Sequence, residues 1–246
     1  MFRLISILLV IIFAVSLILN WYLFQQSQQY YLQLNQTRLD PLGLTVYDTS
    51  IKNLSDKPEV VFFGDSRAED WHAPKLLSQF DFVNRGIGAQ TSSQVLYRFE
   101  RHIVPLQPQV VIIQVGINDL KTIPLFPHQK ETIIANCKAN IAQIVSESVA
   151  LDSTVILTTI FPVGEPPLMR QPFWSPDVTQ AVDEVNDYLK TLQEANVIIL
   201  DTYPILGDDD GKIQPRYAKD LLHLNENGYH ALNVELAILL RSIDFQ

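Results

Sequence analysis

Short apolar runs alternate along the chain with longer segments of helical periodicity. The apolar runs lie at 60–63 (VVFF), 110–115 (VVIIQV), 154–160 (TVILTTI) and 197–200 (VIIL), with a weaker one around Phe82 and Val83. The helical segments lie near 92–103, 131–149 and 177–195, and a last helix is expected after Asn227. Apolar strands that lack alternation and are separated by helices predict a parallel sheet covered on both faces. The pattern therefore predicts a doubly wound α/β domain of about five strands.

The N-terminus has a different hydropathy pattern. Residues 4–24 are apolar except for Ser6, Ser16 and Asn20. About 20 such residues span the core of a bilayer as a helix. The run ends in aromatic residues and then in glutamines, as at a membrane interface. A secretory signal peptide would have a shorter apolar region and a small-x-small cleavage site, so we favour an uncleaved signal anchor at residues 1–24.

The charges that flank this segment predict its orientation. Arg3 precedes the span, and no basic residue follows it until Arg38. The positive-inside rule then places the rest of the chain on the extracytoplasmic side of the membrane. We expect a polar spacer at residues 25–57, which is rich in glutamine at first, and a single folded domain at residues 58–246.

Composition narrows the classes of function. The chain has 246 residues, of which 47% are hydrophobic, which suits one large core better than two domains. Its net charge is -9 and its basic residues are scattered, which argues against a nucleic-acid partner and makes any membrane attachment hydrophobic. The single cysteine, Cys137, has no partner at metal-ligand spacing, and we interpret it as a small core residue. Cysteine usage leaves the redox compartment open.

Candidate chemistry is expected where strands end, because parallel α/β sheets bind ligands at the carboxyl ends of their strands. The first strand ends in Gly64-Asp65-Ser66 and leads directly into a helix. A serine on such a turn meets the free N–H groups and the positive end of the helix dipole, as a nucleophile requires. The alternative is that the serine or Asp65 only caps the helix.

A serine nucleophile needs a base, and the base needs an orienting group. Asp220 lies three residues before His223, so on a turn the carboxylate and the imidazole share one side. The alternative is a pair that caps the last helix. Asn118 follows a central strand and can offer an amide to an oxyanion, and backbone N–H groups of the glycine-containing turn at 84–91 can add more.

Together these segments resemble the SGNH (GDSL-type) hydrolase family, whose four motif blocks have this order and spacing. The blocks are Gly64-Asp65-Ser66, the turn at 84–91, Gly116-Ile117-Asn118-Asp119 and Asp220-Leu221-Leu222-His223, and the resemblance covers residues 58 to about 240. It implies a three-layer, flavodoxin-like fold. It also implies Ser66 as nucleophile, His223 as general base, Asp220 as its orienting group, and oxyanion donors from Asn118 and the Ser66 N–H. Such chemistry requires no metal or cofactor.

Two positions depart from the family pattern. Ala89 stands where the second block usually has a glycine, whose N–H is the third oxyanion donor; an alanine retains the donor if the position does not require positive φ. Arg67 follows the serine, where many members have a small or apolar residue. A cation in the first turn of a helix is unfavourable, so Arg67 is a candidate for binding an anionic substrate group, with Glu69 and Asp70 as alternative partners.

The expected function is therefore a membrane-anchored serine esterase that acts through an acyl-enzyme. An O-acyltransferase that uses the same residues and a non-catalytic anchored binding module are the alternatives. Two loops that follow central strands carry apolar residues that line an acyl pocket, touch lipid or only pack the loops. These residues are Leu125, Phe126, Leu168, Met169, Phe173 and Trp174. The sequence leaves the substrate and the oligomeric state open.

Overall fold

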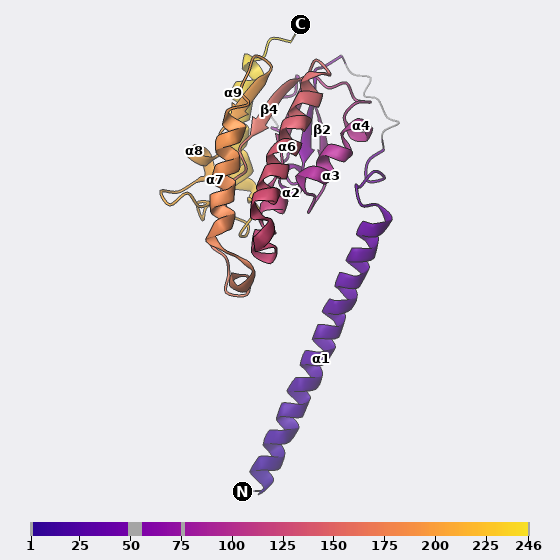
Figure 1. Cartoon of the computed structure of the whole chain (residues 1–246), viewed down its shortest axis with the longest axis vertical. Helices are drawn as coiled ribbons and strands as arrows, with labels where there is room; N and C mark the ends of the chain where they lie inside the picture. Colours follow the sequence, from indigo (N-terminus) through magenta and orange to yellow (C-terminus); the bar gives the residue numbers. More distant parts are fainter. Residues whose placement is uncertain (1, 49–55, 75–76, 246) are drawn as a thin grey trace. The chain divides into compact units, whose positions relative to one another are not determined.

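A computed structural model of the chain describes residues 2–48, 56–74 and 77–245. It divides into two compact units, Met1–Thr45 and Val46–Gln246 (Figure 1). Residues 49–55, which belong to the expected spacer, lie outside the described part.

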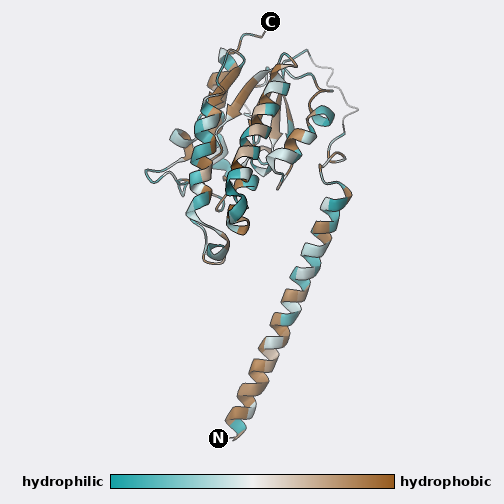
Figure 2. Ribbon diagram, in the orientation of Figure 1, coloured by the Kyte–Doolittle hydropathy of each residue, from teal (hydrophilic) through white to brown (hydrophobic). Residues whose placement is uncertain are grey.

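The first unit is built on one long helix, α1 (Phe2–Leu39), which has no buried residue. The apolar run at 4–24 forms its N-terminal part, and the helix continues through the polar residues that follow, because glycine and proline are absent until Pro41. Figure 2 shows the change from apolar to polar along α1. This helix is long and apolar enough to be a membrane span or a signal sequence. Asp40 then caps a turn, accepting hydrogen bonds from the N–H groups of Leu44 and Thr45.

The second unit contains a five-stranded parallel sheet of order β2-β1-β3-β4-β5, as predicted. The strands are β1 (Glu59–Gly64), β2 (Asp81–Gly86), β3 (Val110–Gln114), β4 (Thr154–Thr158) and β5 (Val197–Leu200). β2 lies beside β1 on one side, and the chain then crosses over so that β3 lies beside β1 on the other side. The carboxyl ends of β1 and β3 thus form the topological switch point, where such sheets bind ligands.

Helices cover both faces of this sheet. They are α2 (Ser66–Glu69), α3 (Ser92–Tyr97), α4 (Phe99–His102), α5 (Ile117–Leu120), α6 (Lys130–Val149), α7 (Pro176–Lys190), α8 (Tyr203–Leu206) and α9 (Glu226–Ser242), with 3-10 turns η1 (Ile123–Leu125), η2 (Pro127–Gln129) and η3 (Gln171–Phe173). Apolar residues of α3, α6 and α7 pack on one face and those of α9 on the other. Figure 1 shows α6 and α7 side by side. The result is the predicted three-layer α/β fold.

The central strands explain why the sequence lacked alternation. In β1, Val61 and Phe63 enter the core beneath α3 and α6, whereas Val60 and Phe62 enter the core beneath α9. A strand that is buried on both faces needs apolar residues at every position. Cys137 is fully buried in α6, as expected for a core residue.

Candidate active site

The turn after β1 holds Ser66 at the carboxyl edge of the sheet. Gly64 ends β1 so close to β3 that a Cβ at this position would lie 1.8 Å from the Gln114 carbonyl oxygen, which only glycine avoids. Asp65 then caps α2 by accepting the Arg67 N–H at 2.9 Å. Ser66 is therefore the first residue of a helical turn.

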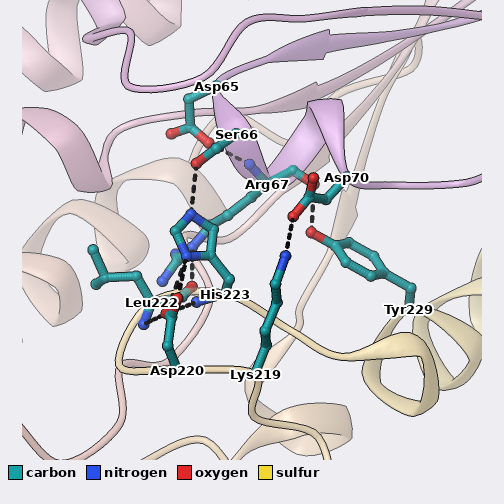
Figure 3. Close-up of polar contacts among 9 residues, drawn as sticks. All are labelled: Asp65, Ser66, Arg67, Asp70, Lys219, Asp220, Leu222, His223 and Tyr229. Atoms are coloured by element: carbon teal, nitrogen blue, oxygen red, sulfur yellow. Dashed lines mark hydrogen bonds and ion pairs between the residues drawn. The ribbon is translucent and has the colours of Figure 1, made fainter.

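Ser66, His223 and Asp220 form a hydrogen-bonded chain, which Figure 3 shows. The Ser66 Oγ lies 3.0 Å from His223 Nε2, and His223 Nδ1 lies 2.8 Å from Asp220 Oδ2. An ionised carboxylate only accepts hydrogen bonds, so Nδ1 carries the proton and the lone pair of Nε2 faces the hydroxyl. The structure thus brings Ser66 together with Asp220 and His223, which lie more than 150 positions later in the sequence.

Asp220 is held in the ionised form that this arrangement needs. Partial burial acts to raise the pKa of Asp220, but the N–H groups of Leu222 and His223 and the His223 ring donate hydrogen bonds to its carboxylate. The net effect is a pKa below the ordinary value of an aspartate. The carboxylate therefore accepts hydrogen bonds from two backbone N–H groups of its own loop and also orients the imidazole.

Arg67 ties the loop that carries His223 to the turn that carries Ser66. Its guanidinium donates from Nε to the Leu222 carbonyl at 2.8 Å and from Nη1 to the Phe161 carbonyl at 3.1 Å. It also lies over the Phe161 ring, 5.2 Å from the centroid. The Tyr229 hydroxyl, from α9, donates to the Arg67 carbonyl at 3.0 Å. Helix α9, the histidine loop and α2 are thereby joined beneath the site.

This placement does not favour the expected contact between Arg67 and a substrate. The side chain is 0% exposed, and its guanidinium points at carbonyls in the protein interior instead of at solvent. Neither Glu69 nor Asp70 accounts for its position, since its hydrogen bonds go to backbone carbonyls of distant segments. The sequence showed an unusual cation but not the two carbonyl groups that it joins.

Asn118 lies at the same edge, in α5 after β3. Its Nδ2 donates to the Gln90 carbonyl at 2.9 Å, and its Oδ1 accepts from Lys121 Nζ at 2.5 Å. One N–H of the amide is thus directed at the loop after β2. That loop also lies against Ser66, because a Cβ on Gly88 would be 4.0 Å from the Ser66 Cβ. The structure thus brings Ser66, Asn118 and the second block together.

Ala89, in the same loop, adopts φ 63°, which lies in the left-handed region. This conformation costs a residue with a Cβ about 1–2 kcal/mol, and glycine avoids the cost. The position therefore has the backbone for which the family's glycine is suited, and alanine occupies it under strain.

Two further side chains hold this half of the site, and neither was predicted from the sequence. Buried Arg98 donates from Nε to Gln90 Oε1 at 2.6 Å and from Nη2 to the Gly64 carbonyl at 2.8 Å, and so joins the end of β1 to the second block. Its sequence signal is a position on the apolar face of a helical segment, three residues after Val95. Lys121 is detectable only as the residue one helical turn after Asn118.

Burial also changes the acid–base properties of the residue before Ser66. Asp65 is fully buried, and burial raises its pKa to about 6 although Arg67 lies nearby. Among residues 2–48, 56–74 and 77–245, no three His, Cys, Asp or Glu side chains gather in a way that could hold a metal ion.

The fold and this arrangement define a class: three-layer α/β proteins with a Ser-His-Asp cluster at the carboxyl edge of the sheet. Within it, the chain belongs to the GDSL-like lipase/acylhydrolase family, which it matches over residues 54–231. The resemblance to SGNH hydrolases is thus confirmed, and the family is one of hydrolases that act as esterases or acylhydrolases.

Named relatives share the sequence or the fold. The platelet-activating factor acetylhydrolase IB subunit alpha2 of Homo sapiens is 28% identical over 200 residues, which cover 77% of this chain and 80% of the relative. A GDSL-like lipase from Bacteroides thetaiotaomicron is 22% identical, with a TM-score of 0.61, and the match covers 84% of this chain and 96% of that one. A variant of an acetyl xylan esterase from Geobacillus stearothermophilus is 20% identical, with a TM-score of 0.56 and coverage of 77% and 97%.

Proposed function

We propose that this protein is a membrane-anchored serine esterase whose catalytic unit faces the extracytoplasmic side. One observation carries the proposal: the Ser66 Oγ lies 3.0 Å from His223 Nε2 while Asp220 accepts from the other ring nitrogen at 2.8 Å. This is the geometry of an activated hydroxyl whose base is oriented by a carboxylate. The family supports ester hydrolysis as the reaction.

In the proposed mechanism, the Ser66 Oγ attacks the ester carbonyl carbon while His223 Nε2 takes the hydroxyl proton. The carbonyl oxygen becomes an oxyanion, which the Asn118 Nδ2 and the N–H groups of Ser66 and Ala89 stabilise. His223 then gives its proton to the leaving alcohol as the carbon–oxygen bond breaks, which leaves an acyl-enzyme. Water, deprotonated by His223, releases the acid and restores the Ser66 hydroxyl.

Helix α1 supports the anchor. Its apolar run has the length of a bilayer core, and Arg3 lies on its N-terminal side. The positive-inside rule then favours a cytoplasmic N-terminus and an extracytoplasmic catalytic unit. The net charge of the chain is -9, so its overall charge does not attract it to anionic lipid headgroups, and the apolar helix supplies the attachment.

The test is a substitution of the nucleophile in the full chain. Ser66→Ala should lower the turnover of a p-nitrophenyl ester at least about 10⁴-fold, since the loss of a nucleophile leaves only binding and oxyanion stabilisation. A fluorophosphonate probe should label the unchanged chain and not the variant. Ser242→Ala, at an exposed serine of α9, is the matched control and should retain turnover and labelling. Undiminished turnover by Ser66→Ala would rule out the assignment.

The names of the relatives support the reaction but not a substrate. One is an acetylhydrolase of a platelet-activating factor system and another an acetyl xylan esterase, so ester hydrolysis is common to them while the alcohol differs. An acyl-length series on this chain would define the preferred acyl group. The same assay with added polysaccharide measures whether a sugar hydroxyl competes with water for the acyl-enzyme.

A further inference from the structure

Five large apolar side chains are exposed on two loops that follow central strands. They are Leu125 and Phe126, after β3, and Leu168, Met169 and Phe173, after β4. We call these five residues the apolar patch. Met169 is 85% exposed and Leu168 is 78% exposed, so the tip of the second loop presents its side chains almost fully to solvent. Contiguous exposed apolar groups mark binding surfaces more often than isolated ones do.

The two loops lie next to each other. Lys130, which begins α6 after the first loop, forms an ion pair of 2.7 Å with Asp177, which lies at the start of α7 after the second loop. Helix α7 also contacts η1, the 3-10 turn that ends at Leu125. In Figure 1 the loops that lead into α6 and α7 lie at the same end of these paired helices. The apolar patch is therefore one surface made of two segments.

This surface borders the candidate active site. Both loops follow the carboxyl ends of parallel strands, the edge at which Ser66 and Asn118 lie. Arg170, between Met169 and Phe173, is exposed. The ammonium of Lys121 donates a hydrogen bond to Asn118. Burial lowers the pKa of Lys121, and repulsion from the positive charge of Arg170 lowers it further. Two cations thus accompany the apolar side chains at this edge of an acidic protein.

We propose that the apolar patch docks on the bilayer that holds α1, so that the site receives esters whose acyl chains lie in the membrane. The inference rests on the proposed anchored esterase and assigns it a substrate class, lipid esters. Transfer of leucine, methionine and phenylalanine side chains from water to acyl chains is favourable, and an adjacent arginine is attracted to lipid phosphates. The apolar helix and the apolar patch belong to one chain, so the same bilayer can bind both.

The length of α1 is compatible with this docking. Its polar part, residues 25–39, is at most about 22 Å long at 1.5 Å per residue. A domain of about 200 residues has a radius of gyration of about 16 Å and hence a diameter of about 40 Å. Residues 40–45, which complete the tether, add little to this length because the N–H groups of Leu44 and Thr45 bond back to the Asp40 carboxylate. A tether of this length leaves the domain within reach of the lipid.

A site-specific probe tests the docking itself. Met169→Cys in the full chain, labelled with the environment-sensitive dye NBD, is placed at one copy per nanodisc of phosphatidylcholine, with and without phosphatidylglycerol. Cys137 is fully buried and should remain unlabelled. Val234→Cys, at an exposed position of α9 on the other face of the sheet, is the matched control.

We expect the dye at position 169, and not at 234, to emit at shorter wavelength and to be quenched by lipids with brominated acyl chains. Stronger quenching with phosphatidylglycerol would assign part of the attraction to Arg170. Equal emission and equal quenching at the two positions would overturn the docking. A blue shift at 169 without quenching would also overturn it, because the dye would then be buried against protein.

Turnover provides a second measurement. In Leu168→Glu/Met169→Glu, turnover of a fluorogenic diacyl lipid in the nanodisc, divided by turnover of p-nitrophenyl acetate, should fall at least tenfold. Val234→Glu/Ile238→Glu places the same charges on α9 and should leave this ratio within twofold of the unchanged chain. If this ratio in Leu168→Glu/Met169→Glu also stays within twofold of the unchanged chain, the result would contradict a docking role. Should neither ester be hydrolysed, the proposed function fails, while the dye still decides whether the patch meets lipid.

Discussion

The amide of Asn118 is held at both ends. Its Nδ2 donates to the Gln90 carbonyl, and its Oδ1 accepts from Lys121. A side-chain amide can otherwise rotate and present its oxygen where a donor is needed. The ammonium of Lys121 prevents this rotation, because the opposite orientation would set the NH2 group against a cation. In the proposed mechanism Lys121 is therefore a positioning residue for the oxyanion donor.

Lys121→Met should lower kcat about tenfold with little change in KM. The loss of a whole oxyanion donor costs about 10²–10³ in kcat, and a loosened one should cost less. Burial lowers the pKa of Lys121, so the unchanged chain should also lose kcat at alkaline pH as the ammonium deprotonates. Lys121→Arg, which keeps a cationic donor, should retain more kcat and lack this alkaline loss. Steady-state kinetics from pH 7 to 11 would measure both effects, and an unchanged kcat in Lys121→Met would contradict the role.

Asp65 makes stability depend on pH. Because its pKa is about 6 in the folded chain and near 3.8 ordinarily, the folded state retains a proton that the unfolded state has released between these values. The stability that the protonated carboxyl contributes is complete below pH 3.8 and is lost as the pH rises through 6. Each pKa unit corresponds to about 1.4 kcal/mol, so the loss is about 3 kcal/mol.

Asp65→Asn should remove this dependence while its amide oxygen still accepts the Arg67 N–H. Between pH 4 and pH 7, the free energy of unfolding of Asp65→Asn should therefore rise by about 3 kcal/mol relative to that of the unchanged chain. Denaturant unfolding of the detergent-solubilised chain at several pH values measures the difference. Asp209→Asn, in an exposed turn, is the control. A difference between Asp65→Asn and the unchanged chain that does not vary with pH would show that Asp65 has an ordinary pKa.

At this scale, motif spacing predicted which residues come together but not what holds them. Ser66, Asn118 and His223 could be selected because each occupies a strand end or a recognisable spacing. Arg98 could not, because an arginine in an amphipathic segment resembles a surface cation until its partners, the Gly64 carbonyl and Gln90, are known. The left-handed φ of Ala89 likewise has no signal in the local sequence, because an alanine does not predict that conformation.

Among the elements, the loop that carries His223 depends on its ties to its neighbours. It has little regular structure, and the Arg67 guanidinium holds it by donating a hydrogen bond to the Leu222 carbonyl. Lys219 adds an exposed ion pair with Asp70 at 3.4 Å, which Figure 3 shows and which contributes little because water screens it. The buried guanidinium should therefore be the main element that keeps the imidazole within reach of Ser66.

Arg67→Met should lower the free energy of unfolding by about 3 kcal/mol, since it leaves two buried carbonyls without donors. It should also lower kcat more than it raises KM, because the displaced loop carries the proposed base, His223, and not a proposed substrate contact. Arg67→Lys keeps the charge but cannot span both carbonyls, so it should fall between the two chains in both properties. A rise in KM for anionic esters alone, with stability unchanged, would instead support the substrate contact expected from the sequence.

Regular elements were predictable to the extent that their burial was uniform. β1 and β3 were clear because both of their faces are buried. β2, at the edge of the sheet, has partly exposed positions and gave a weak signal. The continuation of α1 to Leu39 was missed because hydropathy marks where a span ends, whereas a polar helix continues until a residue such as Pro41 stops it.

At the scale of the whole molecule, one apolar helix should decide where the protein resides. Leu8→Asp/Ile12→Asp places two carboxylates near the middle of the proposed span, and each costs about 2.5–3.5 kcal/mol at a bilayer centre. Gln33→Asp/Gln36→Asp adds the same charges to the polar part of the same helix, at no such cost. After carbonate extraction, the first variant should move to the soluble fraction while the second and the unchanged chain stay with the membrane at full mass. An unchanged chain that is recovered soluble and shortened by about 24 residues would instead identify the apolar run as a cleaved signal peptide.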